Sequence, residues 1–139
     1  MARLPLWWRF AVLLLGILIL IWLPIEDRSV TGVLIFAALI CILGALAGRA
    51  VVRDRWGAPA RQEGQLRPRT MLRVDLPVWL IAGLVVTPVA FLFMAIKTGM
   101  HGHGTPDYTP AQMVRILYLA PLWILAGLIF GLIASFWQK

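Results

Sequence analysis

The four apolar runs of this sequence lack acidic and basic residues. They contain no Asp, Glu, Lys, Arg or His over residues 10–25, 30–48, 78–96 and 116–137. Charged groups at membrane depth are costly, and where they occur they mark proton relays, ion pathways or counter-ions. Their absence argues against a proton-coupled antiporter, and the lack of histidine argues against a haem or chlorophyll bound within the bilayer.

Cysteine and catalytic constellations are also scarce. Cys41 is the single cysteine, so the chain cannot form an internal disulfide, and its apolar surroundings predict a small packing residue. Ser29 and Ser135 are too far in predicted membrane depth from any histidine to share a site with one. No paired carboxylates face one another within the bilayer, and no phosphate-binding glycine loop is found. We therefore predict that the protein is not an enzyme.

Apolar residues, by contrast, are abundant. They make up 61% of the chain and charged residues only 14%, against roughly 45–50% and about 25% in soluble domains. A chain of 139 residues has too much surface to hide this excess in a globular core, whereas a bilayer can accommodate it. The composition therefore predicts an integral membrane protein, and the length suits a single domain over residues 1–139.

The apolar runs have the length of membrane-spanning helices, which need about 20 residues. We predict helices at about 6–24, 30–48, 77–97 and 110–137. Asp27 or Ser29 would cap the second helix, Pro77 would occupy the first turn of the third, and Thr109 with Gln112 would form a capping box on the fourth. The predicted fold is an all-α integral membrane protein whose four transmembrane helices form two hairpins.

Two prolines fall inside the predicted helices. Pro88 lies near the middle of the third helix and should kink it, and Thr87 could re-satisfy a backbone group that the proline leaves unbonded. Pro121 interrupts the fourth helix in the same way.

The segment 49–75 is the only long hydrophilic run, and we predict a basic loop there. Lysine and arginine collect on the cytoplasmic side of membrane proteins. If both termini lie on the same side as this loop, that side carries the whole net charge of +7 and the opposite side is neutral. We therefore predict cytoplasmic N- and C-termini in a multi-pass protein of the bacterial inner membrane.

The arginines beyond the second helix are candidate contacts for anionic lipid headgroups or for an acidic partner. They are Arg53, Arg55, Arg61, Arg67, Arg69 and Arg73. The loop lacks a stacking platform or a groove-reading element, so we predict no nucleic-acid partner.

Small residues recur at helical spacing in two of the predicted helices. The second helix has Ala37, Cys41, Gly44 and Gly48 on one face, and the fourth has Gly127, Gly131 and Ser135. Close backbone approach at such stripes drives helix association in lipid. The two stripes could pack on each other or on helices of another protein, and the sequence leaves both alternatives open.

The outer loop between the third and fourth helices contains the only metal-like cluster. His101 and His103 would point to the same side of an extended segment and could bind Cu or Zn, with Asp107, Met100 or Glu26 completing the site. Two ligands separated by glycine fall short of the three or four that a stable site needs, so an ordinary solvated loop is the competing interpretation.

These patterns favour a non-catalytic small integral-membrane subunit, or an assembly or stabilising factor, of a larger membrane complex. The layout resembles small four-helix accessory subunits of respiratory or photosynthetic complexes. The alternatives are a small oligomeric transporter or channel, with Thr87, Tyr118 and Cys41 lining its path, and an outer-face metal-binding protein. We predict no cofactor but allow for structural lipids. The expected partners are membrane lipids, larger integral membrane proteins or further copies of the chain.

Overall fold

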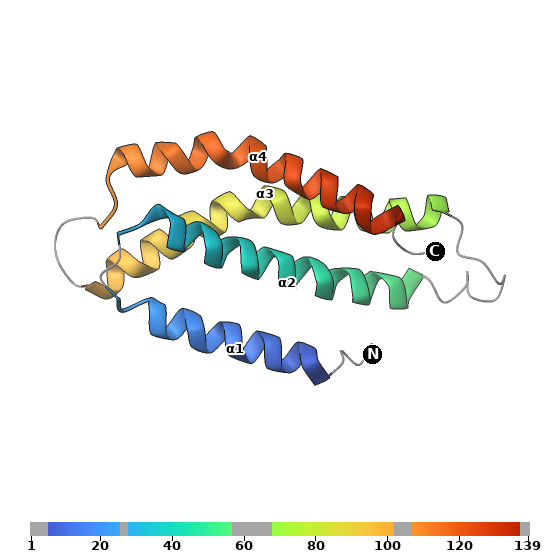
Figure 1. Cartoon of the computed structure of the whole chain (residues 1–139), viewed down its shortest axis with the longest axis horizontal. Helices are drawn as coiled ribbons and strands as arrows, with labels where there is room; N and C mark the ends of the chain where they lie inside the picture. Colours follow the sequence, from blue (N-terminus) through green and yellow to red (C-terminus); the bar gives the residue numbers. More distant parts are fainter. Residues whose placement is uncertain (1–5, 26–27, 57–67, 102–106, 137–139) are drawn as a thin grey trace.

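The computed structural model describes residues 6–25, 28–56, 68–101 and 107–136, and the side chains among them except those of 6–7, 53–56 and 68–71. Every regular element in these ranges is an α-helix. The helices are α1 (Leu6–Trp22), α2 (Val30–Trp56), α3 (Pro68–His101) and α4 (Pro110–Phe136). They lie roughly along one axis, and successive helices run in opposite directions (Figure 1).

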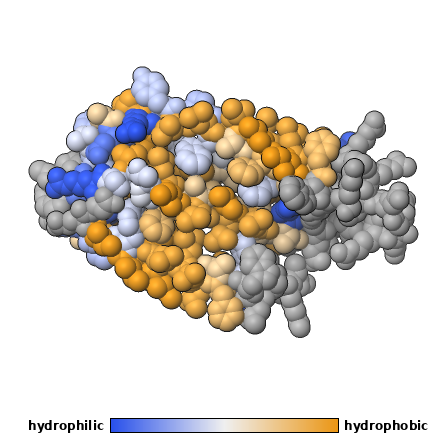
Figure 2. Space-filling view, in the orientation of Figure 1, coloured by the Kyte–Doolittle hydropathy of each residue, from blue (hydrophilic) through white to orange (hydrophobic). Residues whose placement is uncertain are grey.

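Three of the helices are long and apolar enough to cross a membrane. The candidate spans are Val30–Val52 in α2, Leu72–His101 in α3 and Pro110–Phe136 in α4, and α1 is apolar but shorter. A broad hydrophobic belt covers the middle of the molecule, and hydrophilic side chains gather at one end of it (Figure 2). The all-helical fold and the multi-pass membrane character are therefore confirmed.

The arginine-rich segment is more helical than the sequence suggested. The predicted loop 49–75 is wrong in its extent, because α2 continues to Trp56 and α3 already begins at Pro68. Arginine is a good helix former, so the polar composition does not by itself end a helix. Proline does occupy the first position of α3, but it is Pro68, and Pro77 lies inside the helix.

The caps of α2 and α4 follow the sequence. The Ser29 hydroxyl accepts a hydrogen bond from the backbone N–H of Gly32, at 3.3 Å. At α4 the backbone N–H of Thr109 donates to Gln112 Oε1 at 2.8 Å, and the N–H of Gln112 donates to Thr109 Oγ1 at 3.3 Å. The predicted capping box is therefore confirmed, and Ser29 rather than Asp27, which lies outside the described residues, is the observed cap of α2.

Pro88 and Pro121 lie within α3 and α4 without ending them. The hydroxyl of Thr87 is buried and has no hydrogen-bond partner among the described residues. The prediction that Thr87 re-satisfies a backbone group freed by Pro88 is therefore wrong.

The helices differ greatly in how much they pack. α3 makes its most extensive contact with α4 and the next with α2, whereas α1 touches α2 sparingly. Among the described side chains of α1, the buried ones are those of Trp8, Leu15 and Trp22, which recur every seven residues and so lie on one face. α1 is thus attached to the bundle through a narrow row of large side chains, and its other faces are exposed.

Candidate functional site

The contact between α3 and α4 is built on glycine. A Cβ atom added at Gly127 would collide with the backbone carbonyl oxygen of Trp79, and one added at Gly83 would collide with that of Trp123. At Gly131 the nearest atom to an added Cβ would be Leu76 Cα, at 3.0 Å. The two backbones therefore approach as closely as only glycine permits, which is how helices associate in lipid.

The two predicted small-residue stripes have different surroundings. On α4, Gly127 and Gly131 face α3, and the Ser135 hydroxyl donates a hydrogen bond to the carbonyl of Leu132 in its own helix, at 2.7 Å. The α4 stripe therefore packs on α3, and its Gly127 lines one small cavity together with Cys41 of the α2 stripe. Gly83, which completes this contact from the α3 side, was not singled out in the sequence because it has no second glycine at helical spacing.

The α2 stripe is buried at one end and open at the other. Ala37 and Cys41 are buried. Gly44 has no atom within 4 Å of an added Cβ, and Gly48 has only Val78 Cγ1, at 3.9 Å. Part of this stripe therefore lines an open surface.

A buried ionic cluster joins three helices at the end of the bundle where α2 ends and α3 begins. Arg49 Nε donates to Asp75 Oδ1 at 2.7 Å, and its Nη2 donates to Asp75 Oδ2 at 3.3 Å and to the carbonyl oxygen of Ala134 at 3.1 Å. Asp75 is 0% exposed. The bidentate geometry matches the planar guanidinium to the carboxylate and connects α2, α3 and α4 at one point. We call this the Arg49 cluster.

A second buried cluster lies at the opposite end. The side chain of Lys97 is 1% exposed, and its Nζ lies 4.1 Å from the ring centroid of Trp22. This distance is within the range of a cation–π interaction between α3 and α1. His101 Nδ1 lies 2.6 Å from Asp107 Oδ2, and Asp107 and Tyr108 are buried beside α3 and α4.

Sequence reasoning missed the Arg49 cluster and the contact of Lys97 with Trp22, although it had placed His101 and Asp107 in one candidate site. It assigned Arg49 and Asp75 to the basic loop and Lys97 to the end of the third helix. One signal was available, because Lys97 and Trp22 both end apolar runs that meet at the same side of the membrane. The pairing of Arg49 with Asp75 had no such signal, since it requires knowing that α2 and α3 are neighbours.

The other predicted site residues are described only in part. His101 binds Asp107, whereas His103 lies outside the described residues, and the described residues contain no group of three His, Cys, Asp or Glu that could hold a metal ion. Metal binding by His101 and His103 stays a prediction. Arg73 is exposed on α3. The side chains of the other predicted contact arginines lie outside the described part of the structure: Arg53, Arg55, Arg61, Arg67 and Arg69.

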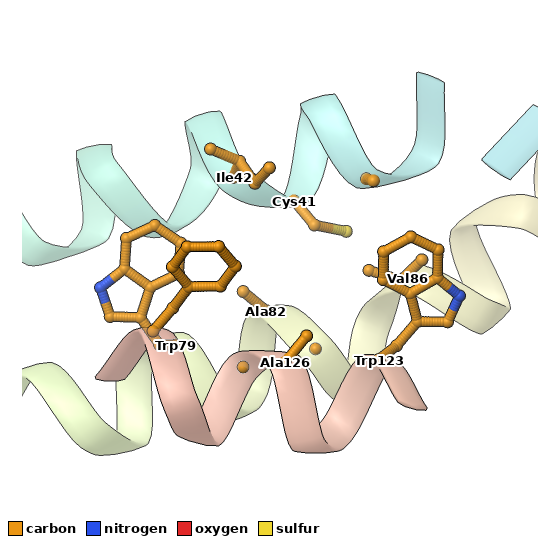
Figure 3. Close-up of a pocket in the computed structure, with 11 residues that line it drawn as sticks. Cys41, Ile42, Trp79, Ala82, Val86, Trp123 and Ala126 are labelled. Atoms are coloured by element: carbon orange, nitrogen blue, oxygen red, sulfur yellow. The ribbon is translucent and has the colours of Figure 1, made fainter. Parts of the chain in front are cut away.

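Several hollows are present among the described residues, and two of them are lined by both α2 and α3. One is a cavity of about 50 Å³ in which Cys41 of α2 faces Ala82 of α3 and Ala126 of α4, between the indoles of Trp79 and Trp123 (Figure 3). Binding pockets for small molecules occupy about 300–1,000 Å³, so this cavity is too small for a cofactor. The other is an open groove of about 370 Å³ between α2 and α3, lined by Ile40, Cys41, Gly44, Ala45, Gly48, Val78, Ile81, Ala82, Val85 and Val89.

We found no protein-family model, no curated protein and no solved structure that matches this chain.

Proposed function

We propose that this protein is a non-catalytic integral-membrane subunit, or an assembly or stabilising factor, of a larger membrane complex. The observation that carries the proposal is the closed contact between α3 and α4, where Gly83 and Gly127 bring the two backbones together. Such a contact leaves no room for a path between these helices. The exposed apolar faces of the helices then provide the surface on which other membrane helices could pack.

The placement of the buried charges supports the same proposal. In the described residues these charges lie at the two ends of the bundle. Each is paired with a side chain of the same protein: Arg49 with Asp75, and His101 with Asp107. Ionic groups used in this way hold helices together rather than move ions, because a transport path needs exchangeable groups along its length.

We further propose that all four helices cross the membrane as two hairpins with cytoplasmic N- and C-termini, in a bacterial inner membrane. The start of α1, the end of α2, the start of α3 and the end of α4 lie at the same end of the bundle (Figure 1). The arginine-rich segment follows α2 at this end, and the positive-inside rule then assigns it to the cytoplasm.

The transporter alternative has less support. The three residues that could line a path have different surroundings: Thr87 and Cys41 are buried in the bundle, whereas Tyr118 is 79% exposed on α4. A path between protomers would need polar groups that converge on one surface. We therefore keep the subunit as the function that the geometry supports best.

The test is native gel electrophoresis of membranes solubilised in a mild detergent, followed by a denaturing second dimension. We expect the 15.5 kDa chain to migrate within a much larger complex, and deletion of its gene to remove or destabilise that complex. Migration as a lone chain in every mild detergent, together with unchanged complexes in the deletion strain, would refute the proposal.

A triple variant separates the two roles of the arginine-rich segment. Replacing Arg61, Arg67 and Arg69 with Gln leaves Arg49, Arg53, Arg55 and Arg73 to hold the topology. If the segment binds an acidic partner, the variant should insert with the correct topology but no longer associate with the complex. If it only fixes topology, complex formation is unchanged.

A further inference from the structure

The groove between α2 and α3 has the shape of a lipid site. Its walls are apolar side chains and glycine, and Gly44, Ile81 and Val85 are exposed along its open side. On α2 it runs from Ile40 to Gly48 and on α3 from Val78 to Val89. In a bilayer such a groove cannot stay empty, because the surrounding hydrocarbon fills it.

The groove has the length of one leaflet. Its α3 wall covers 11 residue steps from Val78 to Val89, which at 1.5 Å per residue is about 16 Å. The hydrocarbon core of a bilayer is about 30 Å thick, so one leaflet contributes about 15 Å. A helix that crosses the membrane would need a groove twice this long, whereas one acyl chain fits it.

One end of the groove meets the charged end of the bundle. Gly48 is followed directly by Arg49, and Val78 lies three residues after Asp75. Arg49, bound to Asp75, is partly exposed, and Arg73 is exposed on α3. A phosphate that entered at this end would therefore meet positive charge, while its acyl chain would extend toward the middle of the membrane.

We propose that the α2–α3 groove is a binding site for one anionic phospholipid of the leaflet at the Arg49 end. The acyl chain lies along Gly44, Val85 and Val89, and the headgroup lies at the Arg49 end, where arginines attract anionic lipid. The site does not depend on the proposed subunit role, since it uses only residues of this chain.

Gly44 allows the site to be blocked without disturbing the bundle. No atom lies within 4 Å of an added Cβ at Gly44, which lines the groove, so Gly44→Leu directs its side chain into the groove. Gly16 on α1 is equally open but lies outside the groove, which makes Gly16→Leu the matched control. Val85→Phe blocks the groove from the α3 wall and is the second variant if Gly44→Leu fails to fold.

The experiment is native mass spectrometry of the delipidated, purified chain after addition of phosphatidylglycerol or phosphatidylcholine. We expect one phosphatidylglycerol to remain bound to the wild type and to Gly16→Leu, and about tenfold less of it to remain on Gly44→Leu and Val85→Phe. Phosphatidylcholine should be retained more weakly by the wild type.

Three results would overturn the proposal. Equal lipid retention by wild type, Gly44→Leu and Val85→Phe would place the lipid elsewhere. Equal retention of phosphatidylglycerol and phosphatidylcholine would show that the arginines do not select an anionic headgroup. A wild-type dimer that Gly44→Leu abolishes, without a change in bound lipid, would show that a second copy occupies the groove. If the wild-type chain binds lipid as expected but migrates in no larger complex on native gels, only the proposed subunit role is contradicted.

Discussion

Helix α1 and the α3–α4 pair are held in the bundle by opposite means. α3 and α4 meet backbone to backbone, with glycine at the points of closest approach. α1 meets the bundle through large side chains, chiefly Trp22, whose ring centroid lies 4.6 Å from that of Phe36 and 6.1 Å from that of Phe93. Lipid supplies little hydrophobic drive between helices, so association depends on the number of close contacts.

The difference suggests that α2, α3 and α4 form one stable unit and that α1 is attached to it more weakly. The Arg49 cluster belongs to the first unit, because its hydrogen bonds connect all three helices. α1 is connected at its Trp22 end through the cation–π contact with Lys97. Variants of the two regions should therefore have effects of different size.

The largest effect should come from breaking the Arg49 cluster. Arg49→Met leaves Asp75 as a buried charge without its guanidinium, and such a loss costs about 3–5 kcal/mol of the free energy of unfolding. Denaturation in increasing sodium dodecyl sulfate, followed by circular dichroism, measures the change. The double variant Arg49→Met/Asp75→Leu should recover most of the loss, and equal destabilisation of the single and double variants would contradict this account.

The next effect concerns the α3–α4 contact. Gly127→Leu forces a side chain against the Trp79 carbonyl, and overpacking of this kind costs about 1–3 kcal/mol or more. An added Cβ at Gly16 on α1 has no atom within 4 Å, so Gly16→Leu should leave the same unfolding transition unchanged. If both variants lower stability equally, the proposed difference between the two regions is lost.

A smaller effect is expected at the attachment of α1. Trp22→Ala removes two aromatic contacts and a cation–π interaction that contributes about 2 kcal/mol when desolvated. Single-molecule distance measurements between labels on α1 and α3 should show α1 separating while the α3–α4 distance is retained. Trp22→Phe keeps a ring and should fall between alanine and wild type. Loss of the α3–α4 distance in the alanine variant would mean that α1 is part of the stable unit.

The smallest change, with the opposite sign, is expected at Thr87. Its buried hydroxyl has no partner among the described residues, and removing such a group with an isosteric side chain is neutral or stabilising by about 1 kcal/mol. Thr87→Val should therefore unfold at the same or a higher detergent concentration than wild type. Clear destabilisation would reveal a hydrogen bond to this hydroxyl in the membrane, which Thr87→Ser would partly restore.

The elements of this fold were predictable from the sequence because each contains an apolar run, and α2 and α4 also have a local start signal. Thr109 and Gln112 illustrate this, since a capping box depends only on residues three positions apart. Helix ends in the arginine-rich segment were not predictable from composition. Arginine favours helices and also marks loops on the cytoplasmic side, so the continuation of α2 to Trp56 had no distinct signal.

The candidate sites were less predictable because they depend on which helices are neighbours. The glycines of α4 indicated a packing face, but nothing in them specified α3 as the partner. Gly83, alone in its run, became visible only beside the Trp123 carbonyl. The same holds for the α2–α3 groove, whose two walls come from segments about 40 residues apart in the chain.

The Arg49 cluster also has a consequence for biosynthesis. Asp75 lies 26 residues after Arg49, and Ala134 lies 85 residues after it. At about 5–20 residues per second, the carboxylate is synthesised about 1–5 s after the guanidinium, and the carbonyl about 4–17 s after it. During this interval Arg49 has neither partner, and its long side chain can extend to the aqueous boundary. Insertion of α3 and then of α4 would therefore complete the cluster in order, so that α4 joins it only after Arg49 and Asp75 can pair.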